Sequence, residues 1–203
     1  MNKKMIIYTL GQMLKIEGFL MFLPLLVGLI YHEQEAIYYF IVGLITLVLG
    51  IVISHKRPKN TVIYAKEGFA IVALSWLVLS LFGAIPFWLS KEIPTYVDAF
   101  FEIVSGFTTT GSSILTDIES LTYASLFWRS FSHWVGGMGI LVFVVAFISD
   151  AHGTTMHILK AEMPGPIVGK LVSKVTVSAR LLYKIYAVLT IIEVVLLMVG
   201  EKY

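Results

Sequence analysis

Six small polar residues stand together in this chain, Thr108 to Ser113, with the sequence "TTTGSS". Their backbone carbonyl oxygens, facing a common axis, could replace the hydration shell of a cation. Their small side chains would let several such segments approach that axis, and Gly111 can adopt dihedrals that other residues avoid. An external turn rich in Ser and Thr is the alternative, and the composition of the segment does not decide between the two.

The composition of the whole chain indicates a membrane protein. Hydrophobic residues make up 58% of it and charged residues 14%, against roughly 45–50% and about 25% in soluble domains. The chain has no cysteine, which excludes disulfides, thiolate metal sites and redox motifs. Two lysines precede the first apolar run, and no small-residue cleavage site follows it, which favours an uncleaved first span over a signal peptide.

Five segments are long and apolar enough to cross a bilayer, which takes about 20 residues. They cover approximately residues 5–31, 35–54, 68–89, 123–149 and 179–200. In the first, Pro24 predicts a kink, and Lys15 and Glu17 are expected to snorkel toward the cytosolic end. Lys and Arg gather before the first span, between the second and third, and between the fourth and fifth. This distribution predicts a cytosolic N-terminus and an external connection at 90–122.

Within that connection, residues 94–107 predict a helix too short to span the membrane. Pro94 suits a first helical turn, and apolar side chains recur on one helical face, at Val97, Phe100, Phe101 and Val104. Such a helix can return as irregular backbone only where protein buries it or water lines it. We therefore expect a re-entrant helix followed by a strand at Thr108 to Ser113, with partial negative charge at the helix C-terminus.

Five segments, in this order and spacing, carry a family resemblance: "KEGFAIVALSWLVLSLFGAIPFWLS" (66–90), "DAFFEIVSGFTTTGSSIL" (98–115), "WRSFSHWVGGMGILVFVVAF" (128–147), "AEMPGP" (161–166) and "ARLLYKIY" (179–186). The chain resembles the N-terminal part of a TrkH-type subunit of the Trk/Ktr/HKT superfamily of potassium transporters. The resemblance implies an all-α membrane protein with about five transmembrane helices plus one re-entrant pore helix and filter strand. It implies two extra N-terminal helices in 1–60 and a first helix–pore helix–filter–helix repeat in 61–150. Residues 151–203 would hold a cytosolic linker and the first helix of an incomplete second repeat.

The resemblance also implies the ligands of a transported ion. The backbone carbonyls of Thr109, Thr110, Gly111 and Ser112 would bind K+, with Thr108 and Ser113 flanking them. No organic cofactor is expected in this chain. The family's remaining repeats are absent from the sequence, so we expect a piece of a longer protein rather than four copies around one axis. Relatives tend to have Ala and Thr where this chain has Ser112 and Ser113.

Two ionisable residues fall inside the fourth span. Arg129 is expensive in lipid, and we expect it to brace the filter through Glu102 or Asp98, with snorkelling as the alternative. His133 has no second histidine nearby, so a packed, hydrogen-bonded role is favoured over a proton relay or metal ligand. The glycines that follow would permit close helix approach: Gly136, Gly137 and Gly139. Glu33 and Glu35 are expected in a solvated loop.

The sequence thus predicts potassium uptake through a channel-like filter, and no enzyme activity. Expected partners are membrane lipid, the remaining repeats, a second copy of the full-length subunit and a cytosolic nucleotide-binding regulatory ring facing 150–178; no nucleic acid is expected. The expected location is the cell membrane, crossed several times. A non-transporting scaffold or regulator is the alternative. An intramembrane hydrolase using Ser112 or Ser113 with His133 is disfavoured, because no Gly-x-Ser-x-Gly elbow is present.

Overall fold

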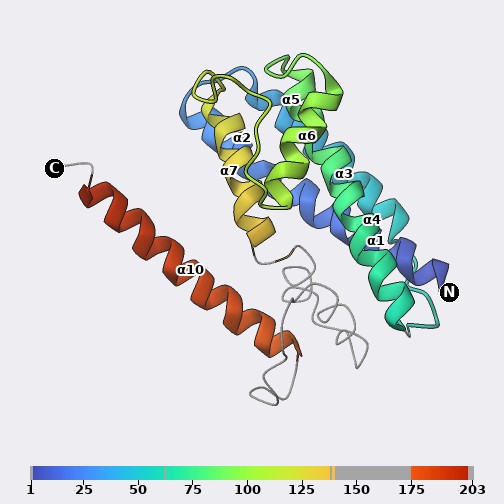
Figure 1. The fold of residues 1–203 in the computed structure, drawn as a ribbon. Coiled ribbons are helices and arrows are strands. Elements are labelled where there is room, and N and C mark those ends of the chain that lie inside the picture. The colour runs from blue at the N-terminus through green and yellow to red at the C-terminus, as the bar shows by residue number, and fades with distance from the viewer. Residues whose placement is uncertain (1, 62, 138, 140–174, 201–203) are drawn as a thin grey trace.

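The computed structural model describes residues 2–61, 63–137, 139 and 175–200, and every regular element in these ranges is an α-helix (Figure 1). The helices are α1 (Lys3–Leu20), α2 (Phe22–Ile30), α3 (Ala36–Ile53), α4 (Ala65–Gly83), α5 (Ile85–Leu89), α6 (Tyr96–Phe107), α7 (Tyr123–Gly137) and α10 (Val175–Gly200). Four stretches of this part are long and apolar enough to span a membrane: Lys3–Ile30, Ala36–Ile53, Lys66–Leu89 and Leu181–Gly200.

The first predicted span is divided between α1 and α2 at Met21. Pro24 lies three residues further on, where its ring clashes with the carbonyl four residues earlier and it has no N–H to donate. The predicted kink is therefore confirmed, one turn before the proline itself. The third predicted span is divided in the same way at Ala84, two residues before Pro86.

Glu17 does not snorkel, and that prediction is wrong. Its side chain is 3% exposed, and neither carboxylate oxygen has a hydrogen-bond partner among the described residues. A Cβ atom added to Gly83 on α4 would lie 3.1 Å from its Oε1. The rotation of α1 that buries one of its faces against α4 decides where the Glu17 side chain points. The position of Glu17 along the sequence does not reveal this rotation.

Helix α3 returns along α1 with the two backbones almost in contact. A Cβ on Gly18 would meet the backbone of Gly43 and Leu47, and a Cβ on Gly50 would meet the backbone of Lys15 and Gly11. Small residues at a helix interface allow this close approach, which is the usual basis of helix packing in membranes. The pair forms the foundation on which α4 and the shorter helices pack.

Helix α7 is held at its start by a residue predicted to be solvated. The carboxylate of Glu33 accepts hydrogen bonds from the backbone N–H groups of Tyr123 and Ala124, at 2.7 and 3.0 Å. An acidic group at this position satisfies N–H groups that a helix leaves open and complements its dipole. The solvated-loop prediction for Glu33 is therefore wrong. The rest of the predicted fourth span, 138–149 apart from Gly139, lies outside the described residues.

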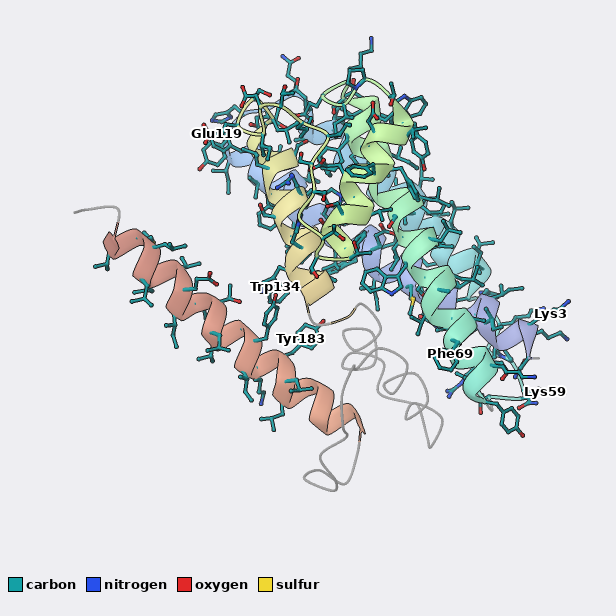
Figure 2. All side chains as sticks on the ribbon, in the orientation of Figure 1. Lys3, Lys59, Phe69, Glu119, Trp134 and Tyr183 are labelled. Atoms are coloured by element: carbon teal, nitrogen blue, oxygen red, sulfur yellow. The ribbon has the colours of Figure 1, made fainter. Side chains whose placement is uncertain are left out.

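Helix α10 lies at one side of the bundle and meets α7 through aromatic contacts (Figure 1). The Trp134 indole stacks on Tyr186 with ring centroids 5.4 Å apart, and its Nε1 donates to Thr190 Oγ1 at 3.0 Å. Figure 2 shows Trp134 and Tyr183 at this contact. The packing role expected for Gly137 is confirmed, since a Cβ there would meet the Tyr186 hydroxyl.

Candidate functional site

The predicted short helix is α6. It is 12 residues long and begins after Thr95, whose Oγ1 accepts a hydrogen bond from the Asp98 N–H at 3.1 Å. This is an ordinary N-cap, so Pro94 precedes the cap instead of lying in the first turn. At about 1.5 Å per residue, such a helix covers only about half the hydrocarbon core.

Only half of the apolar face predicted for α6 points outward: Phe100 and Val104 are partly buried, and Phe100 packs against the core. Val97 is 73% exposed and Phe101 46% exposed, whereas the buried face consists of small, polar and apolar residues together: Ala99, Glu102, Ile103, Ser105, Gly106 and Phe107. Lipid is as apolar as these side chains, so no hydrophobic force drives Val97 and Phe101 inward. The inward face is set by packing and by hydrogen bonds.

The C-terminus of α6 closes in a Schellman motif. The Thr109 N–H donates to the Gly106 carbonyl and the Thr110 N–H to the Ser105 carbonyl, both at 2.9 Å. Thr109 occupies the left-handed position with φ 55°, where glycine is usual and a β-branched residue is an outlier. The N–H groups at the start of the polar segment are thereby turned back into the helix.

The hydroxyl groups turn the same way. Thr108 Oγ1 donates to the Val104 carbonyl at 2.7 Å and lies 2.8 Å from Thr110 Oγ1. Thr109 Oγ1 donates to the Thr108 carbonyl at 2.7 Å. In the part of the chain that the structure describes, the hydrogen bonds that this segment donates end on carbonyls of residues up to 108, within the Thr108–Thr110 hydroxyl pair, or on Glu102. None ends on the carbonyls of residues 109–113.

Residues 108–113 are irregular backbone, not the strand that the sequence predicts. Thr109 and Gly111 both have positive φ, 55° and 75°, which an extended strand cannot accommodate. Residues 108–112 are exposed, and a Cβ on Gly111 would meet no atom within 4 Å. An exposed polar segment thus lies beneath a helix end in an otherwise apolar bundle.

Glu102 joins the three parts of this site. Its carboxylate accepts hydrogen bonds from the Ser113 hydroxyl, at 3.1 and 3.0 Å from its two oxygens, and from the Ile114 N–H at 3.0 Å. Arg129 on α7 donates from Nε to Glu102 Oε1 at 2.5 Å. The Glu102 side chain is fully buried and that of Arg129 is 15% exposed. Asp98 instead accepts from the Thr95 hydroxyl at 2.6 Å.

Helix α7 packs tightly beneath this network. A Cβ on Gly106 would overlap Ser132, and one on Gly136 would overlap the Phe107 carbonyl, so Gly136 has its expected packing role. His133 Nδ1 lies 2.9 Å from the Arg129 carbonyl in its own helix. The Ser113 hydroxyl is directed at Glu102 and not at His133, so the nucleophile–base pair of a hydrolase is not formed by these two residues.

A second carboxylate network, around the half-buried Glu92, was missed from the sequence. Glu92 accepts from the Thr122 N–H at 2.7 Å, the Ser90 hydroxyl at 2.9 Å and the Ser125 hydroxyl at 2.5 Å. Tyr39 on α3 lies 2.8 Å from the same Ser125 hydroxyl. Glu92 stands beside Lys91 in the external connection, and no local pattern separates it from a solvated acid. The network fixes both ends of the 90–122 connection.

Comparison with known proteins places these features in context. A sequence model of the TrkH family, described as cation transport protein, matches residues 35–202. The Trk system potassium uptake protein TrkH of Salmonella typhimurium is 39% identical over 175 residues, covering 84% of this chain and 36% of that protein. TrkH of Halomonas elongata is 37% identical over 199 residues, covering 94% of this chain and 40% of that protein. The chain therefore spans little more than a third of their length.

A solved structure has the same fold. The crystal structure of the potassium transporter TrkH from Vibrio parahaemolyticus matches with a TM-score of 0.74 and 31% sequence identity. The match covers 94% of this chain and 38% of that one.

Proposed function

Since this chain belongs to the TrkH family of cation transport proteins, we propose that it supplies the first quarter of a potassium-selective filter. The ligands in this proposal are the backbone carbonyl oxygens of Thr109 to Ser112, flanked by Thr108 and Ser113. Neutral carbonyl oxygens suit a weakly hydrated cation. Mg2+ holds its own waters too tightly to accept such a cage.

The observation that carries the proposal is the arrangement of donors around residues 108–113. N–H and hydroxyl groups at the start of the segment are directed into α6, and its far end is tied to buried Glu102. A segment so constrained can present carbonyls to a cation without rearranging when the ion arrives. In this proposal Glu102 and Arg129 support the filter and do not touch the ion.

The proposed organisation follows the family. Residues 1–60 would form two extra membrane helices, 61–150 the first repeat, and 151–203 a cytosolic linker with the first helix of the next repeat. The intact protein would supply the remaining quarters, sit in the cell membrane with a cytosolic N-terminus, and pair with a second copy. A cytosolic nucleotide-binding ring would regulate it from the 150–178 side.

The test is potassium uptake by a host that lacks its own uptake systems and expresses the intact protein carrying this sequence. We expect wild type to restore growth at low potassium and to accumulate Rb+. Glu102→Ala should abolish both, and Glu35→Ala, a charge loss outside the network, should abolish neither. Wild-type protein that inserts normally and transports neither ion would favour the non-transporting scaffold.

A further inference from the structure

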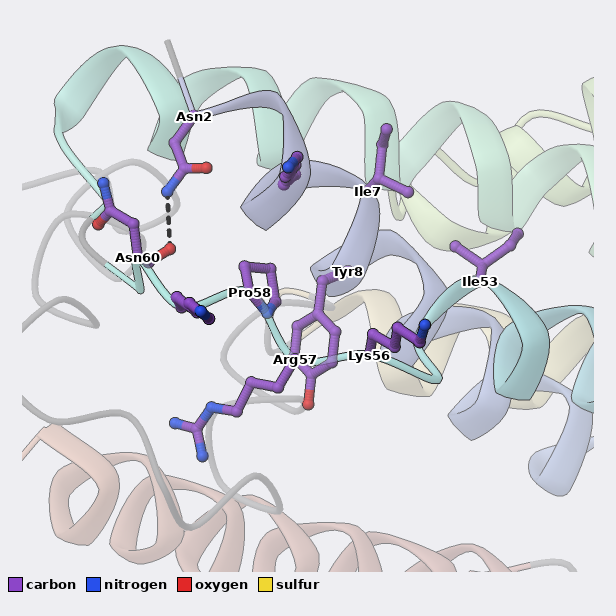
Figure 3. Close-up of a pocket in the computed structure, with 10 residues that line it drawn as sticks. Asn2, Ile7, Tyr8, Ile53, Lys56, Arg57, Pro58 and Asn60 are labelled. Atoms are coloured by element: carbon purple, nitrogen blue, oxygen red, sulfur yellow. Dashed lines mark hydrogen bonds between the residues drawn. The ribbon is translucent and has the colours of Figure 1, made fainter.

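A basic cavity lies at the end of the bundle that carries the N-terminus, away from the filter segment. It is formed by the start of α1, the end of α3 and the loop that follows, with a volume of about 640 Å3 (Figure 3). Four cationic side chains line it: Lys4, Lys56, Arg57 and Lys59. None of the described residues that line it is acidic.

Asn2 holds the cavity in shape. Its Nδ2 donates to the Asn60 carbonyl at 2.9 Å, which fastens the α3–α4 loop to the start of α1 (Figure 3). Its Oδ1 accepts from the Met5 N–H at 3.2 Å as the cap of α1, and its own N–H donates to Glu67 on α4 at 2.9 Å. The loop that bears Lys56 and Lys59 is thus joined to two helices at once.

The three lysines of this cavity are available for an anion. Lys4, Lys56 and Lys59 form no ion pair with any residue that the structure describes. The nearby acid, Glu67, accepts from the backbone N–H groups of Asn2 and Tyr64. Ammonium groups held around one hollow match a phosphate group, which accepts several charge-assisted hydrogen bonds.

Apolar surface continues from the cavity along the helices. Ile7 and Ile53 line it and are 54% and 40% exposed. Val52 and Val48 extend the exposed apolar strip along α3, at 66% and 48%. Tyr8 also lines the cavity, and tyrosine is enriched at membrane–water interfaces.

We propose that this cavity binds the headgroup of an anionic glycerophospholipid from the leaflet on the N-terminal side. The phosphate would lie among Lys4, Lys56 and Lys59, and the acyl chains along Ile7, Ile53 and the α3 strip. Basic pockets between membrane helices bind anionic headgroups in this manner. The adjoining apolar strip favours a lipid over a free phosphate or an acidic protein segment.

Native mass spectrometry of the intact protein tests the proposal, with phosphatidylglycerol as the anionic probe and phosphatidylcholine as the zwitterionic one. Wild type should retain phosphatidylglycerol in preference. Lys56→Gln with Lys59→Gln, and separately Lys4→Gln with Lys56→Gln, should weaken that binding about tenfold. Lys66→Gln with Lys184→Gln removes the same charge from exposed positions outside the cavity and should leave binding unchanged. Asn2→Ala should weaken binding without removing charge.

Ile53→Ser distinguishes the sources of phosphate. It should weaken phosphatidylglycerol binding and leave glycerol phosphate binding unaltered. Equal retention of both lipids by wild type, or undiminished phosphatidylglycerol binding in both cavity variants, would overturn the proposal. Complete displacement of the lipid by inorganic phosphate would show a free-anion site instead. Cavity variants that lose a cytosolic protein partner and keep the lipid would assign the surface to that partner.

Discussion

The Nε of Arg129 lies 2.5 Å from Oε1 of Glu102, although 27 residues separate them in sequence. The pair joins α7 to the short helix α6, and the same carboxylate holds the end of the polar segment through Ser113 and Ile114. The charge of Arg129 is thereby compensated inside the bundle by Glu102, which also holds the end of the polar segment.

Removal of Arg129 should therefore destabilise the protein. Arg129→Ala leaves the buried Glu102 carboxylate without its cationic partner, at a cost of about 3–5 kcal/mol. Arg129→Lys should cost less because it keeps a cation within reach. Glu102→Gln combined with Arg129→Gln should recover part of the loss. Thermal unfolding midpoints in detergent measure the series, and a double variant as poor as the two single defects summed would contradict the pairing.

Gly111→Ser should reduce discrimination of K+ against Na+. A Cβ there has open space, so the cost comes from φ 75°, a conformation that disfavours L side chains. A distorted cage with fewer carbonyls suits the smaller ion, and selectivity should fall roughly tenfold, about 1.4 kcal/mol. Rb+ and Na+ uptake in the same vesicles measures it, with Gly200→Ser, which also has open space, as the control. Unchanged selectivity would identify residues 108–113 as a polar turn.

Cysteines introduced at Lys91 and Thr116 should react with an impermeant thiol reagent from outside the cell. Both positions are exposed, and the chain has no cysteine of its own to interfere. Lys66→Cys should react only after the membrane is opened, because the positive-inside rule places it in the cytosol. Labelling of the first two only from the cytosolic side would reverse the proposed topology.

Glu17 and Glu102, which are both buried, should respond differently to neutralisation. Glu102→Gln loses charge-assisted bonds to Arg129 and Ser113, and the unfolding midpoint should fall. Glu17→Gln removes an acid that has no partner among the described residues, and an unpaired charge in an apolar interior is costly. Its unfolding midpoint should stay level or rise. A large loss of stability in Glu17→Gln would mean that the Glu17 carboxyl has a partner outside the described residues.

Glu33→Ala should weaken the start of α7. The loss of two N–H acceptors at a helix N-terminus costs about 1 kcal/mol. Glu35→Ala is the matched control in the same loop, since the Glu35 side chain makes no capping bond. Hydrogen exchange at the amides of Tyr123 and Ala124 reports the effect directly. Equal protection in wild type and Glu33→Ala would show that the cap contributes nothing.

The sequence predicted the membrane helices because an apolar run of sufficient length has few alternatives. It also predicted an ion pair between Arg129 and Glu102, because two opposite charges at similar depth in an apolar region are stabilised by pairing. Pro24 predicted a kink in the first span, which the structure has at Met21, and Pro86 is placed in the same way after the break at Ala84. These features depend on local chemistry.

Features that depend on distant chain segments could not be predicted. Glu33 is 90 residues from Tyr123, and Glu92 is 33 residues from Ser125, so no spacing pattern marks either bond. The burial of Glu17 depends on how α1 is rotated against α4. The irregular conformation of residues 108–113 depends on two positive φ angles, and threonine at position 109 gives no sign that it will adopt one.

The glycine contacts between α1 and α3 have a genetic consequence. Every missense change at a glycine codon adds at least a Cβ atom, and at Gly18 and Gly50 that atom would meet the backbone of the neighbouring helix. These codons therefore have no acceptable missense neighbours one nucleotide away. Codons for the exposed apolar residues of α3, such as Val48 and Val52, have several acceptable missense neighbours, because lipid accepts any of the aliphatic side chains. Amino-acid substitutions should accordingly accumulate on the lipid-facing surface of α3 and be rare where α3 contacts α1.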